Sequence, residues 1–283
     1  MARIYAIVNQ KGGVGKTTTT VSLAAALAAF EQSVLLVDLD PQGNATTASG
    51  QDKHEIEAGT VEVLLGEQEP AAAVRAMSPA GYDLLASNED LTAAEVELIQ
   101  SEDRFLRLKQ ALDGIAAYYD YILIDCPPSL GMLTLNALTA ADGVIVPLQC
   151  EFFALEGLSA ITRTVERVRE TLNPDLALEG VLRTMFDPRN RLASEVSEQL
   201  TEHFAGPLYQ TVIPRNVRLA EAPSHGLPVI HYDPSSRGSY AYMDLAAEIL
   251  ERHDQLSEHA VLEQATRPAA AEEREPMNLE NDA

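Results

Sequence analysis

A glycine-rich segment near the N-terminus constrains this sequence more than any other feature. Residues 9–18 read Asn-Gln-Lys-Gly-Gly-Val-Gly-Lys-Thr-Thr, between strand formers at 4–8 and an alanine- and leucine-rich helical pattern at 18–30. Backbone N–H groups converge on a phosphate only where side chains leave room, and a helix N-terminus adds unpaired amides and the positive end of its dipole. The strand, the turn and the helix together predict a phosphate-binding loop.

The loop departs from the usual pattern G-x-x-x-x-G-K-[ST] at its first position, where Gln10 replaces glycine. We expect Lys16 to reach the β- and γ-phosphates of a nucleotide and the Thr17 hydroxyl to ligate Mg²⁺. A second lysine, Lys11, lies inside the loop instead of the missing glycine. The residues expected to contact the nucleotide here are Lys11, Gly12, Gly13, Val14, Gly15, Lys16, Thr17 and Thr18.

Length and patterning predict one α/β domain. Short apolar runs alternate with longer helical patterns over most of the 283 residues, which favours a doubly wound, mostly parallel β-sheet flanked by helices. Buried strands are expected at 33–38, 121–125 and 143–148. The domain is expected to span residues 1–256, with a last packed helix at 240–252. Residues 257–283 are polar and acidic and are expected to form a disordered tail.

Several compartments and site types are disfavoured by the composition. No apolar stretch approaches 18 residues, and the N-terminus enters a strand pattern without the apolar region of a signal peptide. The two cysteines, Cys126 and Cys150, lack C-x-x-C spacing, and the six histidines are scattered. We therefore expect a cytoplasmic protein without a structural zinc site.

The net charge of −23 argues, taken alone, against nucleic-acid binding. The acidic residues are unevenly distributed along the chain, however. Residues 51–103 carry thirteen acidic and two basic residues, whereas residues 183–218 carry five arginines and four acids. Because binding depends on local potential more than on the total, a small basic patch on an acidic molecule is compatible with this sequence.

Aspartates end two of the expected strands. Asp125 follows the run Ile122-Leu-Ile, as does the metal-site aspartate of many phosphate-loop proteins, and Asp38 and Asp40 end a second apolar strand. Ligands of open α/β folds bind at this carboxyl edge of the sheet. We expect Asp125, Asp38 and Thr17 at the metal and Asp40 beside the attacking water. The alternative for Asp40 is that it only caps the following turn.

Several segments resemble the deviant Walker ATPases, specifically the ParA/Soj chromosome and plasmid partitioning proteins. Three of them surround the expected nucleotide site: residues 11–18 (Lys-Gly-Gly-Val-Gly-Lys-Thr-Thr), 38–44 (Asp-Leu-Asp-Pro-Gln-Gly-Asn) and 124–129 (Ile-Asp-Cys-Pro-Pro-Ser). Further matches lie at 151–157, 185–189 and 214–224, so the resemblance spans roughly residues 2–252.

The resemblance implies a role for each matched residue. Lys11 would be the signature lysine, which reaches the phosphates of the nucleotide held by the other subunit of a nucleotide-sandwich homodimer. Gly12 would face its counterpart across that dimer, and Pro214 would contact the nucleotide. Asp40 would position the attacking water, and Asp125 would be the Walker B aspartate.

The resemblance also implies a timed switch that uses ATP and Mg²⁺. ATP would favour the dimer, and hydrolysis to ADP and phosphate would remove the contact that depends on the γ-phosphate. Hydrolysis would be slow until a partner or DNA completes the site. The sequence contains no Asn-Lys-x-Asp motif for reading guanine, so we expect ATP rather than GTP.

Non-specific binding of double-stranded DNA by the ATP dimer, association with the nucleoid and a ParB-type partner are further implications of the resemblance. The candidate DNA contacts are Arg189, Arg191, Arg215 and Arg218. Arg189 and Arg218 match positions that the family uses for DNA. The alternative is a solvated surface whose arginines form intramolecular ion pairs. The acidic stretch at 51–103 could attract a basic partner segment, although solvated surface is the simpler interpretation.

Other relatives of the fold are alternatives. A MinD-like, membrane-associated positioning ATPase shares the loop and both aspartates but needs a basic amphipathic C-terminal helix. The C-terminus here is acidic and interrupted by proline, so no membrane partner is expected. An electron carrier of the nitrogenase-reductase type needs paired cysteines at the dimer interface, which Cys126 and Cys150 do not match. A metabolic phosphate-loop enzyme stays open at the level of the fold.

Overall fold

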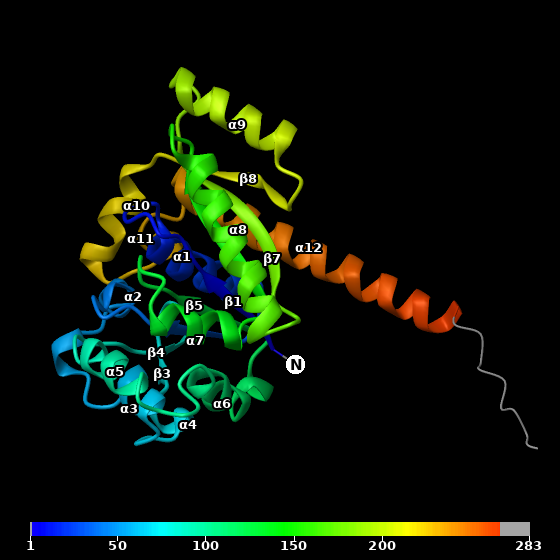
Figure 1. Cartoon of the computed structure of the whole chain (residues 1–283). Helices are drawn as coiled ribbons and strands as arrows, with labels where there is room; N and C mark the ends of the chain where they lie inside the picture. The colour runs from blue at the N-terminus through cyan, green and yellow to red at the C-terminus, as the bar shows by residue number, and fades with distance from the viewer. Residues whose placement is uncertain (1, 267–283) are drawn as a thin grey trace, which may run out of the picture. The chain divides into compact units, whose positions relative to one another are not determined.

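A computed structural model describes residues 2–266 of the chain. The chain is built around one eight-stranded sheet with the order β3-β4-β2-β5-β1-β6-β7-β8 (Figure 1). The strands are β1 (Arg3–Ile7), β2 (Val34–Asp38), β3 (Arg75–Ala76), β4 (Asp83–Leu85), β5 (Tyr121–Asp125), β6 (Gly143–Gln149), β7 (Ala177–Phe186) and β8 (Leu208–Pro214). All neighbouring strands pair in parallel except β3 and β4. The doubly wound, mostly parallel sheet is therefore confirmed.

Helices connect the parallel strands. The α-helices are α1 (Lys16–Ala29), α2 (Asn44–Ala48), α3 (Thr60–Leu65), α4 (Pro70–Ala73), α5 (Leu91–Leu98), α6 (Arg107–Asp113), α7 (Met132–Ala140), α8 (Ala154–Thr171), α9 (Arg191–His203), α10 (Val217–Glu221), α11 (Val229–Tyr232) and α12 (Arg237–Thr266). Three short 3₁₀ turns are η1 (Lys53–Glu55), η2 (Ala116–Tyr118) and η3 (Ala222–His225). No helix among residues 2–266 is long and apolar enough to cross a bilayer.

Both faces of the sheet are buried, which explains why its strands read as continuous apolar runs. On β1, Ile4, Ala6 and Val8 point into a core formed with α3 and α5 to α9. The residues between them, Tyr5 and Ile7, point to the opposite face, against which α1 packs. The alternation places helices on each face of β1, the strand that leads into the glycine-rich loop.

The structure differs from the expected elements in three places. The residues after α4 form the short antiparallel strand β3, which is not among the strands expected from the sequence. Helix α5 arises in an acidic stretch for which the sequence predicted no element, and it buries Leu91, Ala94 and Leu98 on one face. Helix α12 continues to Thr266, through part of the segment expected to be disordered. The rest of that segment, 267–283, lies outside the described residues.

Strand register brings the aspartates to one edge of the sheet. Asp125, the last residue of β5, lies opposite Asp38 on β2 and opposite Ile7 on β1. The glycine-rich loop begins directly after Ile7. Three neighbouring strands therefore deliver the loop and both aspartates to the same carboxyl edge, where ligands of such sheets bind.

Candidate functional site

The glycine-rich loop has the backbone conformation that its glycines allow. Gly13 and Gly15 adopt φ angles of 73° and 92°, in the left-handed region that side-chain-bearing residues avoid, and Gly15 is the N-cap of α1. Gly12 is different, because a Cβ placed on it would meet no atom within 4 Å and its φ is not left-handed. Nothing within the described subunit therefore requires glycine at position 12.

Two hydrogen bonds fix the loop to the neighbouring strands, and a third lies within the loop. The Asn9 side chain donates to the Pro147 carbonyl on β6 at 2.7 Å and accepts from the Lys11 N–H at 2.9 Å. The Thr184 hydroxyl on β7 donates to the Val14 carbonyl at 2.8 Å. These contacts orient the loop over the end of the sheet before any ligand is bound, which lowers the ordering cost of binding.

Lys16 begins α1 and is 8% exposed. Burial lowers the pKa of its ammonium group, and the nearby charges of Asp125 and Asp40 act in the opposite direction. Lys16 is thus close to both acids at the sheet edge. A buried cation at a helix N-terminus suits a phosphate group, which would supply the missing negative charge.

Asp125 is fully buried and accepts hydrogen bonds from two threonines of α1. Thr17 Oγ1 donates to its Oδ2 at 2.7 Å, and Thr20 Oγ1 donates to its Oδ1 at 2.9 Å. Burial raises the pKa of Asp125 and the charge of Asp38 adds to this, whereas the threonine hydrogen bonds lower it. The hydroxyl expected to ligate Mg²⁺ therefore lies beside the strand-ending carboxylate.

Asp38 is also fully buried, and the segment after it surrounds its carboxylate. The Thr46 N–H and hydroxyl donate to Oδ2 at 2.7 and 2.8 Å, and the Asp40 N–H donates to Oδ1 at 3.2 Å. Burial raises the pKa of Asp38 against these hydrogen bonds. Two buried carboxylates on adjacent strands destabilise each other, and a cation nearby would offset that repulsion.

Asp40 lies just beyond Asp38 and is 6% exposed. Its Oδ1 accepts from the Gln42 N–H at 2.9 Å, so it does cap the following turn. Within residues 2–266, its Oδ2 takes no such bond. The turn cap therefore occupies one oxygen of Asp40 and leaves the other able to orient a water.

The donor set fits magnesium better than a metal held by protein alone. Among residues 2–266, no three His, Cys, Asp or Glu side chains are grouped to hold a metal ion. Mg²⁺ keeps several of its waters and uses one or two carboxylates together with substrate phosphates. The hydroxyl of Thr17 and the carboxylates of Asp125 and Asp38 are the oxygen atoms that would be available to such a site.

Lys11, the second lysine of the loop, has a different environment from Lys16. It is half-exposed, and its ammonium group is paired with Glu151, which follows β6. A cavity of about 330 Å³ next to the pair is lined by Lys11, Val14 and Gly157, among other residues. The adjacent Phe152 and Phe153 are 76% and 69% exposed, an unusual exposure for large aromatic side chains.

A second cavity, of about 310 Å³, opens beside the first turn of α1 and is mainly apolar. Its lining includes Gly15, Thr18, Thr184, Met185, Pro214, Asn216, Val217 and Leu219. An apolar cavity next to a phosphate-binding loop suits a nucleobase, with the phosphates on the loop. The structure thus places Thr18 and Pro214, which are distant in sequence, at one cavity.

The four candidate DNA arginines lie on two loops and the helices that follow them. Arg189 lies between β7 and α9 and Arg191 is the first residue of α9, whereas Arg215 follows β8 and Arg218 lies in α10. Hydrogen bonds from Arg189 hold the pKa of Asp187 at about 2, and Arg215 contributes to the same shift. Arg189 and Arg215 are therefore near each other around Asp187.

Five contributing residues were not predicted from the sequence as site residues: Asn9, Thr20, Thr46, Glu151 and Thr184. Thr20 follows Thr17 by one turn of α1, a spacing that places both hydroxyls on one helix face and was available from the sequence. Asn9 joins the loop to β6, Thr184 contacts the loop from β7, and Glu151 contacts it from the residues after β6. No spacing in the sequence indicates those contacts.

Thr46→Val is expected to lower the free energy of unfolding by about 1–3 kcal/mol, because the Thr46 hydroxyl has two buried partners. It donates to the Asp38 carboxylate, and its Oγ1 accepts the Ser87 N–H at 2.8 Å. Urea unfolding measures the change. Thr47→Val is the matched control, since its exposed hydroxyl only donates to the Gly43 carbonyl within α2 and its loss should stay within about 0.5 kcal/mol. Equal losses in the two variants would contradict the importance of the Asp38 contacts.

Comparison with known proteins places this site in a family. The AAA_31 family model, described as an AAA domain, matches residues 2–178. The chromosome partitioning protein ParA of Caulobacter vibrioides is 52% identical over 253 residues, which cover 88% of this chain and 94% of that protein. The chain belongs to the ParA/Soj family.

Two further similarities bear on the chemistry of this ParA/Soj chain. The chromosome-partitioning ATPase Soj of Thermus thermophilus is 49% identical over 251 residues, covering 88% of this chain and 96% of that protein. A solved structure of cobyrinic acid a,c-diamide synthase from Mycobacterium smegmatis, with a bound ATP analogue and magnesium, superposes with a TM-score of 0.79 at 40% identity. It covers 90% of this chain and 96% of that one. The ParA/Soj chain is thus a partitioning ATPase whose cofactors are ATP and Mg²⁺.

Proposed function

We propose that this ATPase is a dimerising switch: two copies bind face to face when each holds ATP, the dimer binds double-stranded DNA without sequence preference, and hydrolysis separates it. In a cell, this would place the protein on the nucleoid. A ParB-type centromere-binding protein is the proposed partner, and stimulation of hydrolysis by that partner would drive segregation of a chromosome or plasmid.

The observation that carries the proposal is the placement of the two loop lysines. Lys16 is buried beside Asp125 and Asp40, whereas Lys11 is half-exposed and paired with Glu151. Gly12, between them, has open space where a side chain would stand. The loop thus has a second cation and an unobstructed stretch of backbone. Both fit the approach of a second copy of the same loop, and Lys11 would then reach the phosphates of the nucleotide in the other subunit.

Charge explains why such a dimer would depend on ATP. Two nucleotides facing each other carry several negative charges, which repel unless cations lie between them. Lys11 from each subunit would supply those cations. A γ-phosphate adds the charge that Lys11 contacts, and its loss on hydrolysis removes the contact and favours separation. Within each subunit, we assign Mg²⁺ to Thr17, Asp125 and Asp38.

DNA binding is assigned to Arg189, Arg191, Arg215 and Arg218. All four are exposed, on an otherwise acidic chain, and they come from two neighbouring loops. One subunit offers few bases, so pairing two subunits would double the number of phosphate contacts. Arginine suits these contacts because its guanidinium group donates two parallel hydrogen bonds to a phosphate.

DNA binding is expected to require ATP and to fall steeply with salt. If the dimer makes four or more phosphate contacts, affinity should drop by about a hundredfold or more between ~50 and ~200 mM salt. Fluorescence anisotropy of a labelled duplex of random sequence measures it. Arg189→Ala removes about one phosphate contact per subunit, so the slope of log affinity against log salt concentration should become shallower by the corresponding amount.

Lys109→Ala, which removes the same charge from α6, is the control and should leave the salt dependence unchanged. Equal DNA binding with and without ATP would contradict the switch. Binding to anionic vesicles in place of DNA would instead favour the membrane-associated alternative.

A further inference from the structure

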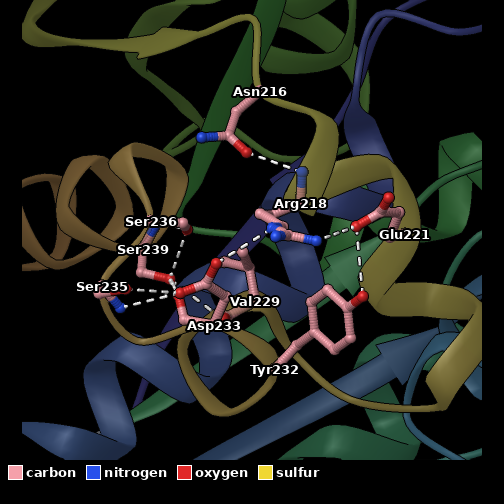
Figure 2. Close-up of polar contacts among 9 residues, drawn as sticks. All are labelled: Asn216, Arg218, Glu221, Val229, Tyr232, Asp233, Ser235, Ser236 and Ser239. Atoms are coloured by element: carbon pink, nitrogen blue, oxygen red, sulfur yellow. Dashed lines mark hydrogen bonds and ion pairs between the residues drawn. The ribbon is translucent and has the colours of Figure 1, made fainter.

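Arg218 is held differently from the other candidate DNA arginines. Its Nη1 lies 2.8 Å from Glu221 Oε2, and its Nε lies 3.1 Å from Asp233 Oδ2. Figure 2 shows the guanidinium group between the two carboxylates. Two negative charges therefore surround one positive charge, and the group is only 51% exposed. We call the set of Arg218, Glu221 and Asp233 the Arg218 clamp.

Both carboxylates of the clamp are fixed by further hydrogen bonds. The Tyr232 hydroxyl donates to Glu221 Oε2 at 3.2 Å, and the Ser235 hydroxyl donates to Asp233 Oδ1 at 2.8 Å (Figure 2). The hydrogen bond from Arg218 lowers the pKa of Glu221, and the Tyr232 hydroxyl acts in the same direction, so Glu221 is ionised at neutral pH. The clamp is thus part of a network rather than a single mobile surface pair.

The geometry of the clamp competes with phosphate. A guanidinium group presents two edges for bidentate hydrogen bonding, one that includes Nε and one formed by the two Nη atoms. Asp233 occupies a donor of the first edge and Glu221 a donor of the second. A phosphate approaching Arg218 would therefore find neither edge complete and would meet two carboxylates at short range, which repel it.

Arg189 and Arg191 lack such a restraint. Arg189 is paired with Asp187, two residues away, and Arg191 with Glu195, one helical turn away. Their side chains are 88% and 92% exposed, and each has one carboxylate partner. The Arg189 pair is bidentate through Nε and Nη2, and the Arg191 pair is a single contact through Nε. In both residues the edge formed by the two Nη atoms faces no carboxylate of residues 2–266 and stays open to a phosphate.

The segment that carries the clamp also forms a wall of the expected nucleobase cavity. Asn216, Val217 and Leu219 line that cavity together with Gly15 and Thr18 of the phosphate loop and α1. Asn216 also accepts the Arg218 N–H at 2.7 Å, as the N-cap of α10. A ligand in this cavity therefore contacts the residues on either side of Arg218 in the chain.

The same segment touches the turn after α2, the helix that follows the Asp40 turn. Gly50 and Gly226 both have φ in the left-handed region, and their backbones are so close that a Cβ on Gly226 would lie 2.6 Å from the Gly50 Cα. Movement of α2 and the turn after it would therefore displace the segment between α10 and α11. The nucleobase cavity contacts the clamp segment directly, and α2, whose Thr46 donates to the Asp38 carboxylate, connects the sheet edge to it.

We propose that Glu221 and Asp233 withhold Arg218 from DNA in the nucleotide-free chain and release it when ATP is bound. The inference rests on the proposed function, because it concerns the assigned DNA contact Arg218. It adds a source for the ATP requirement that does not depend on dimerisation: without ATP, one of the DNA arginines is neutralised within its own subunit.

The test is a DNA-binding measurement on the full chain carrying Glu221→Gln and Asp233→Asn together. Anisotropy of a labelled random-sequence duplex is recorded at low salt without nucleotide, with ADP, and with ATP and Mg²⁺. The nucleotide-free affinity is expected to rise about tenfold, because two carboxylates cease to compete for one guanidinium group. The affinity with ATP should change by less than about threefold, so the ATP dependence shrinks.

Two controls separate the clamp from a general charge effect. Glu198→Gln/Glu202→Gln on α9 removes the same net charge, and we expect a rise of at most about threefold without nucleotide. Adding Arg218→Ala to the double variant should remove the gain. Tyr232→Phe, which keeps the volume of the ring and deletes one hydrogen bond to Glu221, should shift the nucleotide-free affinity in the same direction by a smaller factor.

The outcomes distinguish the two proposals. Wild-type protein that fails to bind DNA with ATP overturns the DNA-binding assignment itself. Wild-type protein that binds only with ATP, together with a double variant that matches the charge control without nucleotide, overturns the clamp alone. Thermal unfolding of each variant shows whether it is folded, and Tyr232→Phe decides the question if the double variant is not.

Discussion

Asp40→Ala is expected to abolish ATP turnover while leaving ATP binding in place. Asp40 is almost fully buried beyond β2, and its Oδ2 is available to orient a water beside the phosphate-binding lysine. Loss of a positioned carboxylate should slow the release of phosphate by about a hundredfold or more. Nucleotide affinity, measured with a fluorescent ATP analogue, should change little, because Lys16 and the loop amides are intact. The variant should therefore persist as an ATP dimer that stays on DNA.

The hydrogen bond from Gln42 to Asp40 makes a second variant informative. Asp40→Asn keeps an oxygen that can accept the Gln42 N–H but removes the carboxylate charge. If Asp40 positions water, both variants lose turnover. If Asp40 only caps the turn, Asp40→Asn retains turnover and Asp40→Ala loses it through collapse of the turn, and the assignment of the water-positioning group is then wrong.

Lys11→Ala is expected to abolish ATP-dependent dimerisation, and with it DNA binding and turnover. Each dimer would lose two charge-assisted hydrogen bonds to phosphates, together worth about 3 kcal/mol or more, so the dimer should weaken by about a hundredfold or more. Sedimentation velocity with ATP measures the dimer. ATP binding by the separate subunits should remain, since Lys16 and the rest of the loop are unchanged.

Glu151→Gln is the matched control for this prediction. It breaks the same ion pair within the subunit but keeps the Lys11 ammonium group. A dimer that survives Glu151→Gln and is lost in Lys11→Ala indicates that the lysine acts across the interface. Loss of the dimer in both variants would show that the pair supports the local structure, and a dimer that survives in both would remove Lys11 from the interface.

Local patterns were sufficient to predict the sheet and the phosphate site. Continuous apolar runs ended by aspartate identified β2 and β5, because parallel strands are buried on both faces and carry their ligands at the carboxyl edge. The glycines of the loop predicted its backbone conformation, because Gly13 and Gly15 adopt left-handed φ angles that glycine tolerates and other residues avoid. In these segments, residues that are close together in the sequence determine the local conformation.

Contacts between distant segments could not be predicted in the same way. Helix α5 was missed because acidic residues interrupt its apolar pattern, and β3 was missed because two residues carry too little pattern to indicate a strand. The pairing of Arg218 with Asp233 joins α10 to the residues after α11, and Glu151 reaches Lys11 from the residues after β6. Such pairs depend on how the elements pack, which residue spacing does not reveal.

The backbone contact between Gly50 and Gly226 limits how this sequence can diverge. Neither glycine supplies a chemical group to the site, yet each occupies the space where the other would need a side chain. A substitution at one position cannot be accommodated by changing the residue at the other, because no smaller residue exists. The turn after α2 and the turn before α11 are therefore expected to change together in evolution, although exposed loops ordinarily vary independently.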